Sequence, residues 1–533
     1  MKKGLLALLL VVIVSSVVLA DHFMGIPEKT RASERPYPRP RYVEFDTKLS
    51  ADQLMFLARQ QARQTETRNG RLGVIEPGKK GLLTLRKEQD LDVVHAVIQA
   101  LRERGADADY VYTEDLLERA GYPRDYATPA HEPDIITEAP LYLVVNGIER
   151  YNFKPDQLTK AAWDKLPKGG EEILADVRKR FDARNAALKK YLDVHPEYDY
   201  VFIDWFSGGP MLTELSDLFG RKFQLGWRIP NKDKLIREGS IPKEVWRVLE
   251  QKVLEVIPWI RSVSVVDPEG TNLQFTINPE DATYWRMGAY LQDYIRMYPF
   301  QSGRWLYRSL GIKHVIVPDA NGVIAGTTGQ DGAVIPYMKL TAKKGLIVNV
   351  DGGGVQGFAM NDVGQKYKDY QLPLLPGPGW LWVFQLSLSV NPKEGASAMD
   401  WAFGPEIYLP EITEFGKKHN IPITHEFHFN NRFPTYEASV TGGKKFRVVD
   451  RGHLTALDDP EVRAIASKYG DPDDILKEEG ARPIPGINAP GSYEEYAKDP
   501  VSYWADQRRQ RQAHSSPYLE IVPALQLRTY ATQ

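Results

Sequence analysis

The pattern of apolar and polar positions predicts an α/β unit in the first half of the chain. GLLTL, which begins at Gly81, and DYVYT, which begins at Asp109, each have the apolar character of a short strand. Between them, residues 91–104 form an amphipathic helical pattern that stops at Gly105. A strand, a helix and a second strand in this order are typical of a parallel sheet covered by helices. The apolar runs APLYLVVNG and YDYVFIDWF predict two more strands of this sheet, the second after a charged helix over residues 171–192.

The pattern changes near Arg261, where short alternating strands replace the longer helices. SVSVVDPEGTNLQFTINP predicts a strand pair around a Pro-Glu-Gly turn. Glycine-rich strands over residues 314–361 follow, and WLWVFQLSLSVNP and IPITHEFHFNN continue them. Such close spacing of turns is typical of a meander or barrel. After Gly452 the pattern becomes helical and then changes to a charged tail rich in proline and glycine, which we expect to wrap the surface.

These patterns predict a fold of the class α/β plus β-rich, with two domains and extensions at both ends. An N-terminal α/β domain with a mostly parallel sheet is expected over residues 49–260. A β-rich, barrel-like domain with a helical tail is expected over residues 261–470, and a C-terminal extension over residues 471–533. A Pro- and Arg-rich stretch, residues 21–48, predicts an extended tether.

The first 20 residues have the layout of an export signal. Lys2 and Lys3 precede an apolar run that carries no charge and ends at Ala20, with Val18 and Ala20 at acceptable −3 and −1 positions for cleavage. The run is also close to the ~17 residues that a spanning helix requires, so an uncleaved membrane anchor is the alternative. Both alternatives predict export to the periplasm or to the extracellular face of the membrane.

Composition narrows the range of partners and of chemistry. The chain has 533 residues, with 68 Lys and Arg against 70 Asp and Glu, so it lacks the concentrated positive charge that nucleic acid binding requires. It has no cysteine, which excludes disulfides, thiolate metal sites and cysteine nucleophiles. A metal site must therefore use His, Asp, Glu, backbone or water.

The stretch ITHEFHFNN, residues 423–431, combines a strand pattern with metal-ligating side chains. Alternation along a strand turns Glu426 and His428 to one face and His425 to the other. Glu426 and His428 could then bind one cation, for which imidazole and carboxylate ligands suit zinc, iron or manganese. The alternative is a half-buried strand whose polar groups are hydrogen-bonded. His453, which precedes a helix, could be a cap, a ligand or a structural residue.

Several motifs of the second half resemble those of aminopeptidase T-like metallopeptidases and the related 2,5-dihydroxypyridine 5,6-dioxygenases. The motifs are GTNLQFTI from Gly270, LSLSVNP from Leu386, and the His-x-Asn pattern at His428, and the βαβ opening also fits. The resemblance covers roughly residues 75–455. It implies an elongated β-rich domain in which two glutamates, two histidines and an aspartate hold two metals.

This chain departs from that ligand pattern at most of its positions. Ala333 and Gln385 replace the two glutamates, and Asn430 replaces the aspartate. Glu406 is the residue nearest to the position of the second histidine. The replacements remove about three negative charges from a site that neutralises two dications, which disfavours a dinuclear centre. What remains is one divalent metal or none, with His428, His425 and His453 as candidate ligands.

The sequence analysis favours an exported aminopeptidase-like metalloenzyme that hydrolyses a peptide or amide, with Glu426 or Glu406 as base. One alternative is a catalytically inactive scaffold or binding subunit at a membrane. A second is an iron-dependent ring-cleaving dioxygenase, and a third is a small-molecule binder that uses the cleft between the two domains. The expected partners are a peptide or small-molecule substrate and, in a homo-oligomer or protein complex, further chains.

Overall fold

The computed structural model describes most of the chain between Arg35 and Gln512. The described residues are 35–40, 49–62, 71–87, 89–128, 139–151, 164, 166, 168–204, 222–224, 232, 235, 241–255, 259–276, 294–298, 319–329, 332–373, 375–389, 398–404, 410–419, 427–478 and 482–512. The apolar run at the N-terminus lies outside them. Within these ranges, no helix is both long and apolar enough to cross a membrane.

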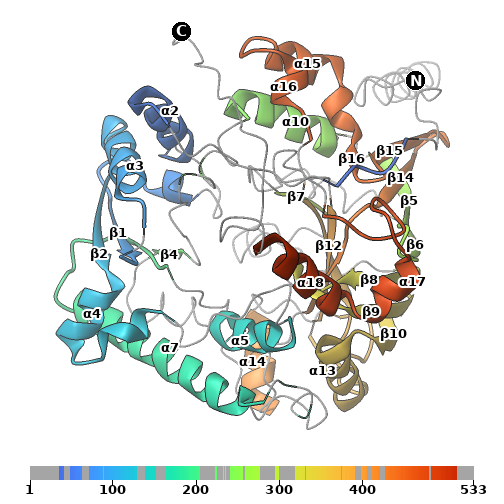
Figure 1. Ribbon diagram of the computed structural model, residues 1–533, viewed down its shortest axis with the longest axis horizontal. Coiled ribbons are helices and arrows are strands. Elements are labelled where there is room, and N and C mark those ends of the chain that lie inside the picture. The colour runs from blue at the N-terminus through green and yellow to red at the C-terminus, as the bar shows by residue number, and fades with distance from the viewer. Residues whose placement is uncertain are drawn as a thin grey trace, which may run out of the picture.

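A parallel sheet of four strands forms the first part of the fold (Figure 1). Its strands are β1 (Lys80–Leu85), β2 (Asp107–Tyr112), β3 (Tyr200–Phe202) and β4 (Lys222–Gln224), in the order β2-β1-β3-β4. All three pairings are parallel, and Leu83 of β1 lies between Tyr110 of β2 and Phe202 of β3. The expected βαβ unit and its parallel sheet are confirmed.

Helices cover both faces of this sheet. On one face, α2 (Ala51–Ala62) and α3 (Leu91–Glu103) pack on Leu83, Leu85 and Phe202. On the other face, α4 (Thr113–Ala120) and α7 (Gly170–Leu192) pack on strand residues whose side chains point the opposite way, among them Leu82 and Val201. Because side chains alternate along a strand, neighbouring apolar residues of β1 supply two separate cores.

One expected strand is a helix. APLYLVVNG lies within α5 (Ala139–Tyr151), so the prediction of a strand there was wrong. Leu141, Val144 and Val145 are buried together in the largest core cluster, at the i, i+3 and i+4 spacing of one helical face. A short apolar run can form either a buried strand or a buried helix, and periodicity alone does not separate the two.

The β-rich part consists of two antiparallel sheets. The larger has the order β10-β9-β8-β6-β5-β14-β15-β16. These strands are β5 (Ile260–Val266), β6 (Asn272–Thr276), β8 (Asn321–Thr328), β9 (Val334–Lys343), β10 (Leu346–Gly352), β14 (Thr435–Val440), β15 (Lys445–Asp450) and β16 (His453–Leu454). The smaller sheet has the order β13-β12-β11-β7, with β7 (Tyr294–Tyr298), β11 (Val383–Ser389), β12 (Ala398–Phe403) and β13 (Phe427–Asn431). In the described part of the chain, neither sheet closes into a barrel.

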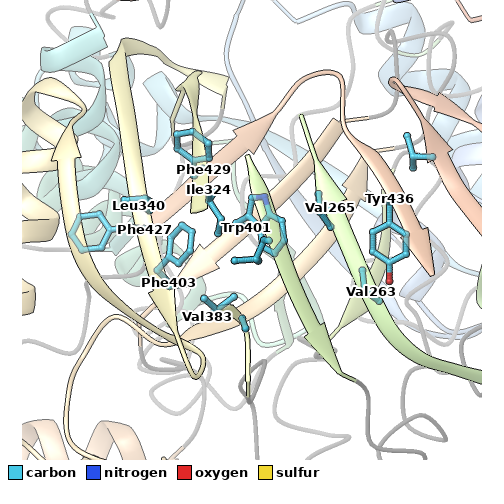
Figure 2. Close-up of a cluster of buried hydrophobic side chains, with 14 of the residues drawn as sticks. Val263, Val265, Ile324, Leu340, Val383, Trp401, Phe403, Phe427, Phe429 and Tyr436 are labelled. Atoms are coloured by element: carbon cyan, nitrogen blue, oxygen red, sulfur yellow. The ribbon is translucent and has the colours of Figure 1, made fainter. Parts of the chain in front are cut away.

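Aromatic and aliphatic side chains fill the space between the two sheets. Figure 2 shows Trp401, Phe403 and Phe429 of the smaller sheet beside Ile324 and Val265 of the larger one. Trp401 is fully buried, and its indole Nε1 donates a hydrogen bond of 2.7 Å to Oδ1 of Asn431. The same core continues into α5, α7 and α10 (Lys243–Glu255), so it includes residues on both sides of position 260. The proposed domain boundaries stay a prediction.

The remaining helices flank the β-rich part. They are α13 (Gly354–Lys366), α14 (Pro410–His419), α15 (Pro460–Ala466), α16 (Pro472–Ile475), α17 (Tyr493–Lys498) and α18 (Pro500–Gln512), with the 3-10 helix η7 (Thr455–Asp458). Two further 3-10 helices, η2 (Arg71–Val74) and η3 (Arg124–Ala127), pack on helices of the α/β part. Helices α17 and α18 pack against β9. In Figure 1, α18 lies in front of the β-rich part, so the last described segment covers this sheet.

Candidate functional site

The turn between β8 and β9 brings together positions that the resemblance assigns to metal ligands. The backbone N–H of Gly329 donates to the carbonyl of Ala333 at 2.8 Å. Gly329 also pairs with Phe429 of β13 in an isolated bridge, and Nδ2 of Asn430 donates to the Gly329 carbonyl at 3.0 Å. Positions 333, 428 and 430, far apart in the sequence, therefore meet at one turn.

His428 is the candidate ligand that lies at this turn. Its residue is 7% exposed, and its backbone carbonyl accepts a 2.6 Å hydrogen bond from Nε2 of Gln356 on α13. Phe427 and Phe429 on either side are buried, as expected for a strand that enters the core. Strand β13 is thus held by hydrogen bonds to the Gln356 side chain of α13 and to the backbone of Gly329.

The described side chains at this turn do not fit a dinuclear metal centre. Ala333 is fully buried and presents a methyl group, and the Asn430 amide is engaged with a backbone carbonyl. Two close dications need anionic ligands, because their mutual repulsion is strong where water is excluded. Amides and a methyl group supply none of that charge.

The C-terminal extension covers the same turn. Val334, Phe433, Ile484, Tyr496 and Trp504 form a separate buried cluster, in which residues beside the turn contact residues of the extension. Nη1 of Arg482 donates to the carbonyl of Gly332 at 2.8 Å. The turn is therefore packed under protein.

His453 lies elsewhere and has carboxylates at both ring nitrogens. It is on β16, five strand positions from β8 in the order of the larger sheet. Its Nδ1 is 2.7 Å from Oε2 of Glu478, and its Nε2 is 2.8 Å from Oδ2 of Asp458. Burial alone would lower the pKa of His453, but the two carboxylates raise it to about 9. The imidazolium donates to both partners, and metal binding would require one of these bonds to open.

Glu406, His425 and Glu426 lie outside the described residues, and their roles stay predictions. In the described ranges, no three His, Asp or Glu side chains form a group that could hold a metal ion.

A buried carboxyl pair that the sequence analysis treated only as turn chemistry lies in the loop between β5 and β6. Glu269 is 2% exposed, and its Oε1 accepts hydrogen bonds from Thr327 at 2.7 Å and from Tyr493 at 3.0 Å. Asp267 accepts the backbone N–H groups of Glu269 and Phe433. Burial, and for Asp267 also the neighbouring Glu269, raises the pKa of both carboxyls. The pair connects the β5–β6 loop, the turn between β13 and β14, and the C-terminal extension.

A second buried acid lies where the parallel strands end. Asp204 lies two residues after the end of β3 and is 3% exposed. Its Oδ1 accepts hydrogen bonds from Thr84 of β1 at 2.6 Å and from Thr113, which follows β2, at 2.8 Å. Nε of Arg86 is 3.5 Å from its Oδ2. One carboxylate thus connects the ends of three strands. A polar residue directly after an apolar run, as in YVFID, is a signal from which the sequence analysis could have found it.

A polar groove of about 380 Å³ crosses the face of β5, β6 and β14. Its carboxylates already have protein partners: Glu437 pairs with Lys445 at 3.0 Å, and Asp319 bonds with Thr276. The remaining polar lining consists mainly of serine hydroxyls and amides, so the groove offers no strong nucleophile or base.

No family model matches this sequence, and no curated protein matches it. Two solved structures are similar to the fold over about three quarters of the chain. The 2,5-dihydroxypyridine dioxygenase of Pseudomonas putida KT2440 is 12% identical, with a TM-score of 0.38, and the alignment covers 76% of this chain and 98% of that one. AmpT of Thermus thermophilus is 13% identical, with a TM-score of 0.30, and the alignment covers 75% of this chain and 98% of that one. Likenesses this low carry no argument about activity.

Proposed function

We propose that the β-rich part is a binding scaffold, without the dinuclear chemistry of the metallopeptidases that its motifs resemble. The observation that supports the proposal is the chemistry of the side chains at the turn between β8 and β9. There a buried methyl group and an amide bonded to a carbonyl occupy ligand positions. The same turn is packed under the C-terminal extension. In this proposal the protein is exported and acts as a binding subunit at the periplasmic or extracellular face of the membrane.

A second candidate is a hydrolase or dioxygenase with one divalent metal. The buried residue His428 favours it, because His425 and Glu426 lie three and two residues before it in the chain. Glu406 is a further candidate. Zinc, iron or manganese would suit these ligands.

Elemental analysis of the purified full chain separates the two candidates. We expect far less than one metal per chain, no gain after incubation with zinc, manganese or ferrous iron, and no change in His428→Ala. The control is His419→Ala, an exposed histidine at the end of α14. About one metal per chain that is lost in His428→Ala but kept in His419→Ala would overturn the scaffold proposal and establish the metal site that the second candidate requires.

A further inference from the structure

The polar groove across β5, β6 and β14 lies on the face of the larger sheet that points away from the core. Val263, Val265 and Tyr436 point into the core between the two sheets (Figure 2). Because side chains alternate along a strand, Ser262 and Ser264 face the opposite way and line the groove. Its volume of about 380 Å³ lies within the size range of sites for small molecules.

Short side chains in the middle of this face produce the hollow. Two rows of paired residues cross the three strands: Thr276, Ser262 and Ser439 form one, and Gln274, Ser264 and Glu437 form the other. Ser439 also pairs with Lys445 of β15, so the first row extends over four strands, or about 14 Å at the usual spacing of strands. Strands favour β-branched and aromatic residues, which would fill this space, but serines occupy three of the central positions.

Four side chains of the groove are available to a ligand. Those of Ser262, Ser264, Gln274 and Ser439 have no hydrogen-bond partner in the part of the chain that the structure describes. A serine hydroxyl both donates and accepts, and a glutamine amide does the same with separate atoms. These groups suit a ligand that carries several hydroxyls, because a hydroxyl can meet either role.

The charged side chains of the groove have partners within the protein. Nζ of Lys445 is 3.0 Å from Oε1 of Glu437, and Nε of Arg447 is 3.6 Å from Oε2 of the same carboxylate. Asp319 accepts the backbone N–H of Thr276 at 2.9 Å and also the Thr276 hydroxyl. A charged ligand would compete with these contacts, whereas neutral hydroxyls can donate to the remaining lone pairs of both carboxylates.

The groove offers little apolar surface. The apolar residues of its lining, Val263 and Phe275, are each 2% exposed and belong to the core. A hydrophobic molecule would therefore bury almost no apolar area against the protein here. The lining thus favours a ligand that is neutral, polar and rich in hydroxyl groups.

We infer that this groove binds a neutral saccharide about as long as a disaccharide. The serine hydroxyls and the Gln274 amide exchange hydrogen bonds with its hydroxyls, and the carboxylates of Asp319 and Glu437 accept from others. The inference rests on the binding role proposed for the β-rich part and gives that role a class of ligand.

Calorimetric titration of the full chain tests this inference with four neutral disaccharides: cellobiose, maltose, lactose and N,N′-diacetylchitobiose. At least one of them should bind with a millimolar or lower Kd. The reducing end of that disaccharide is then converted to the neutral alditol, the anionic aldonate or the cationic amine, which share the same opened ring. The alditol should bind at least about threefold more tightly than either charged form, because the charges of the groove are already paired.

Two variants place the ligand in the groove. Ser264→Tyr fills the middle of the floor with a residue that strands favour, and should weaken binding about tenfold or more. Val266→Tyr makes a similar change on the same face of the same strand but outside the groove, and should leave binding unaltered. Gln274→Ala removes an exposed amide and should weaken binding about three- to tenfold, as expected for one hydrogen bond.

Three outcomes would overturn the inference. These are no binding of any of the four disaccharides at millimolar concentrations, equal binding of a charged form and the alditol, and binding that Ser264→Tyr and Gln274→Ala leave intact or that Val266→Tyr abolishes equally. The unfolding temperature of each variant shows that a loss of binding does not come from unfolding. Metal content is measured separately: a metal at His428 overturns the scaffold proposal, whereas a lack of saccharide binding overturns only this inference.

Discussion

Asp204 in the parallel sheet and Glu269 in the β-rich part are both buried carboxyls, but their hydrogen-bond donors come from different stretches of the chain. Asp204 receives its bonds from Thr84, near the end of β1, and from Thr113, the first residue after β2. Glu269 receives one bond from Thr327 of its own sheet and another from Tyr493 of the C-terminal extension.

The same difference holds for other polar contacts of the two parts. The extension also supplies Glu478 to His453, Arg482 to the Gly332 carbonyl, and Asn488 to the carbonyl of Pro38. The strand ends of the parallel sheet are thus held together from within, whereas a distant segment secures the β-rich part. Stability should consequently respond to different substitutions in the two parts.

The largest effect is expected from Asp204→Ala. It removes the acceptor shared by two threonines and leaves the largely buried Arg86 without this carboxylate. Breaking a buried charged network in this way should lower the free energy of unfolding by about 4 kcal/mol, measured by urea denaturation. Asp92→Ala, which breaks a pair between the exposed Asp92 and Lys232, should leave the urea midpoint almost unchanged, because solvent screens such pairs. If the two changes have equal effects, Asp204 does not hold the strand ends of the parallel sheet together.

A smaller effect is expected from the protonation of His453. Its folded pKa of about 9 lies above the unfolded value of 6.5, so the folded state binds the proton more tightly. The stabilisation, about 3 kcal/mol, is complete below pH 6.5 and is lost as the pH rises through about 9. His453→Gln should remove this component of the pH dependence of unfolding. If the free energy of unfolding depends on pH in the same way in the variant, Asp458 and Glu478 do not stabilise the protonated form of His453.

The smallest effect is expected from Tyr493→Phe. The change removes one donor to Glu269 while Thr327 remains, and should cost about 1 kcal/mol. Limited proteolysis should cleave the C-terminal extension faster in this variant, whereas Tyr370→Phe at an exposed site should not change the rate. If both variants are cleaved at the wild-type rate, the Glu269 contact does not secure the extension.

Local patterns were sufficient to predict most of the fold. Ser50 and Gln53 cap α2 reciprocally: the backbone N–H of Gln53 donates to Ser50 Oγ at 3.2 Å, and the backbone N–H of Ser50 donates to Gln53 Oε1 at 2.9 Å. The strand pair around the Pro-Glu-Gly turn is present as β5 and β6, and the charged helix as α7. The error at α5 arose because its apolar residues face a core made largely by strands that follow much later in the chain.

The candidate sites were less predictable, because they depend on contacts between distant residues. Nothing near His453 in the sequence shows that Glu478 will reach it from 25 residues away. In the sequence, Thr84, Thr113 and Asp204 each indicate only that a strand ends nearby. The order of the strands in the sheet brings the three residues together. The turn chemistry of DPEG was visible, but the tyrosine that makes Glu269 part of a tertiary contact is 224 residues further along.

The contact between Asn488 and Pro38 has a consequence for the order in which the molecule can assemble. The two residues are 450 positions apart, and Arg35 bonds with Asp458 across 423 positions. During synthesis, the parallel sheet can form as soon as β4 has emerged, but the segment around Pro38 cannot dock until almost the whole chain has left the ribosome. A nascent chain halted before Asp458 would therefore lack both contacts. It would present a folded parallel sheet beside an N-terminal segment that proteases can cleave.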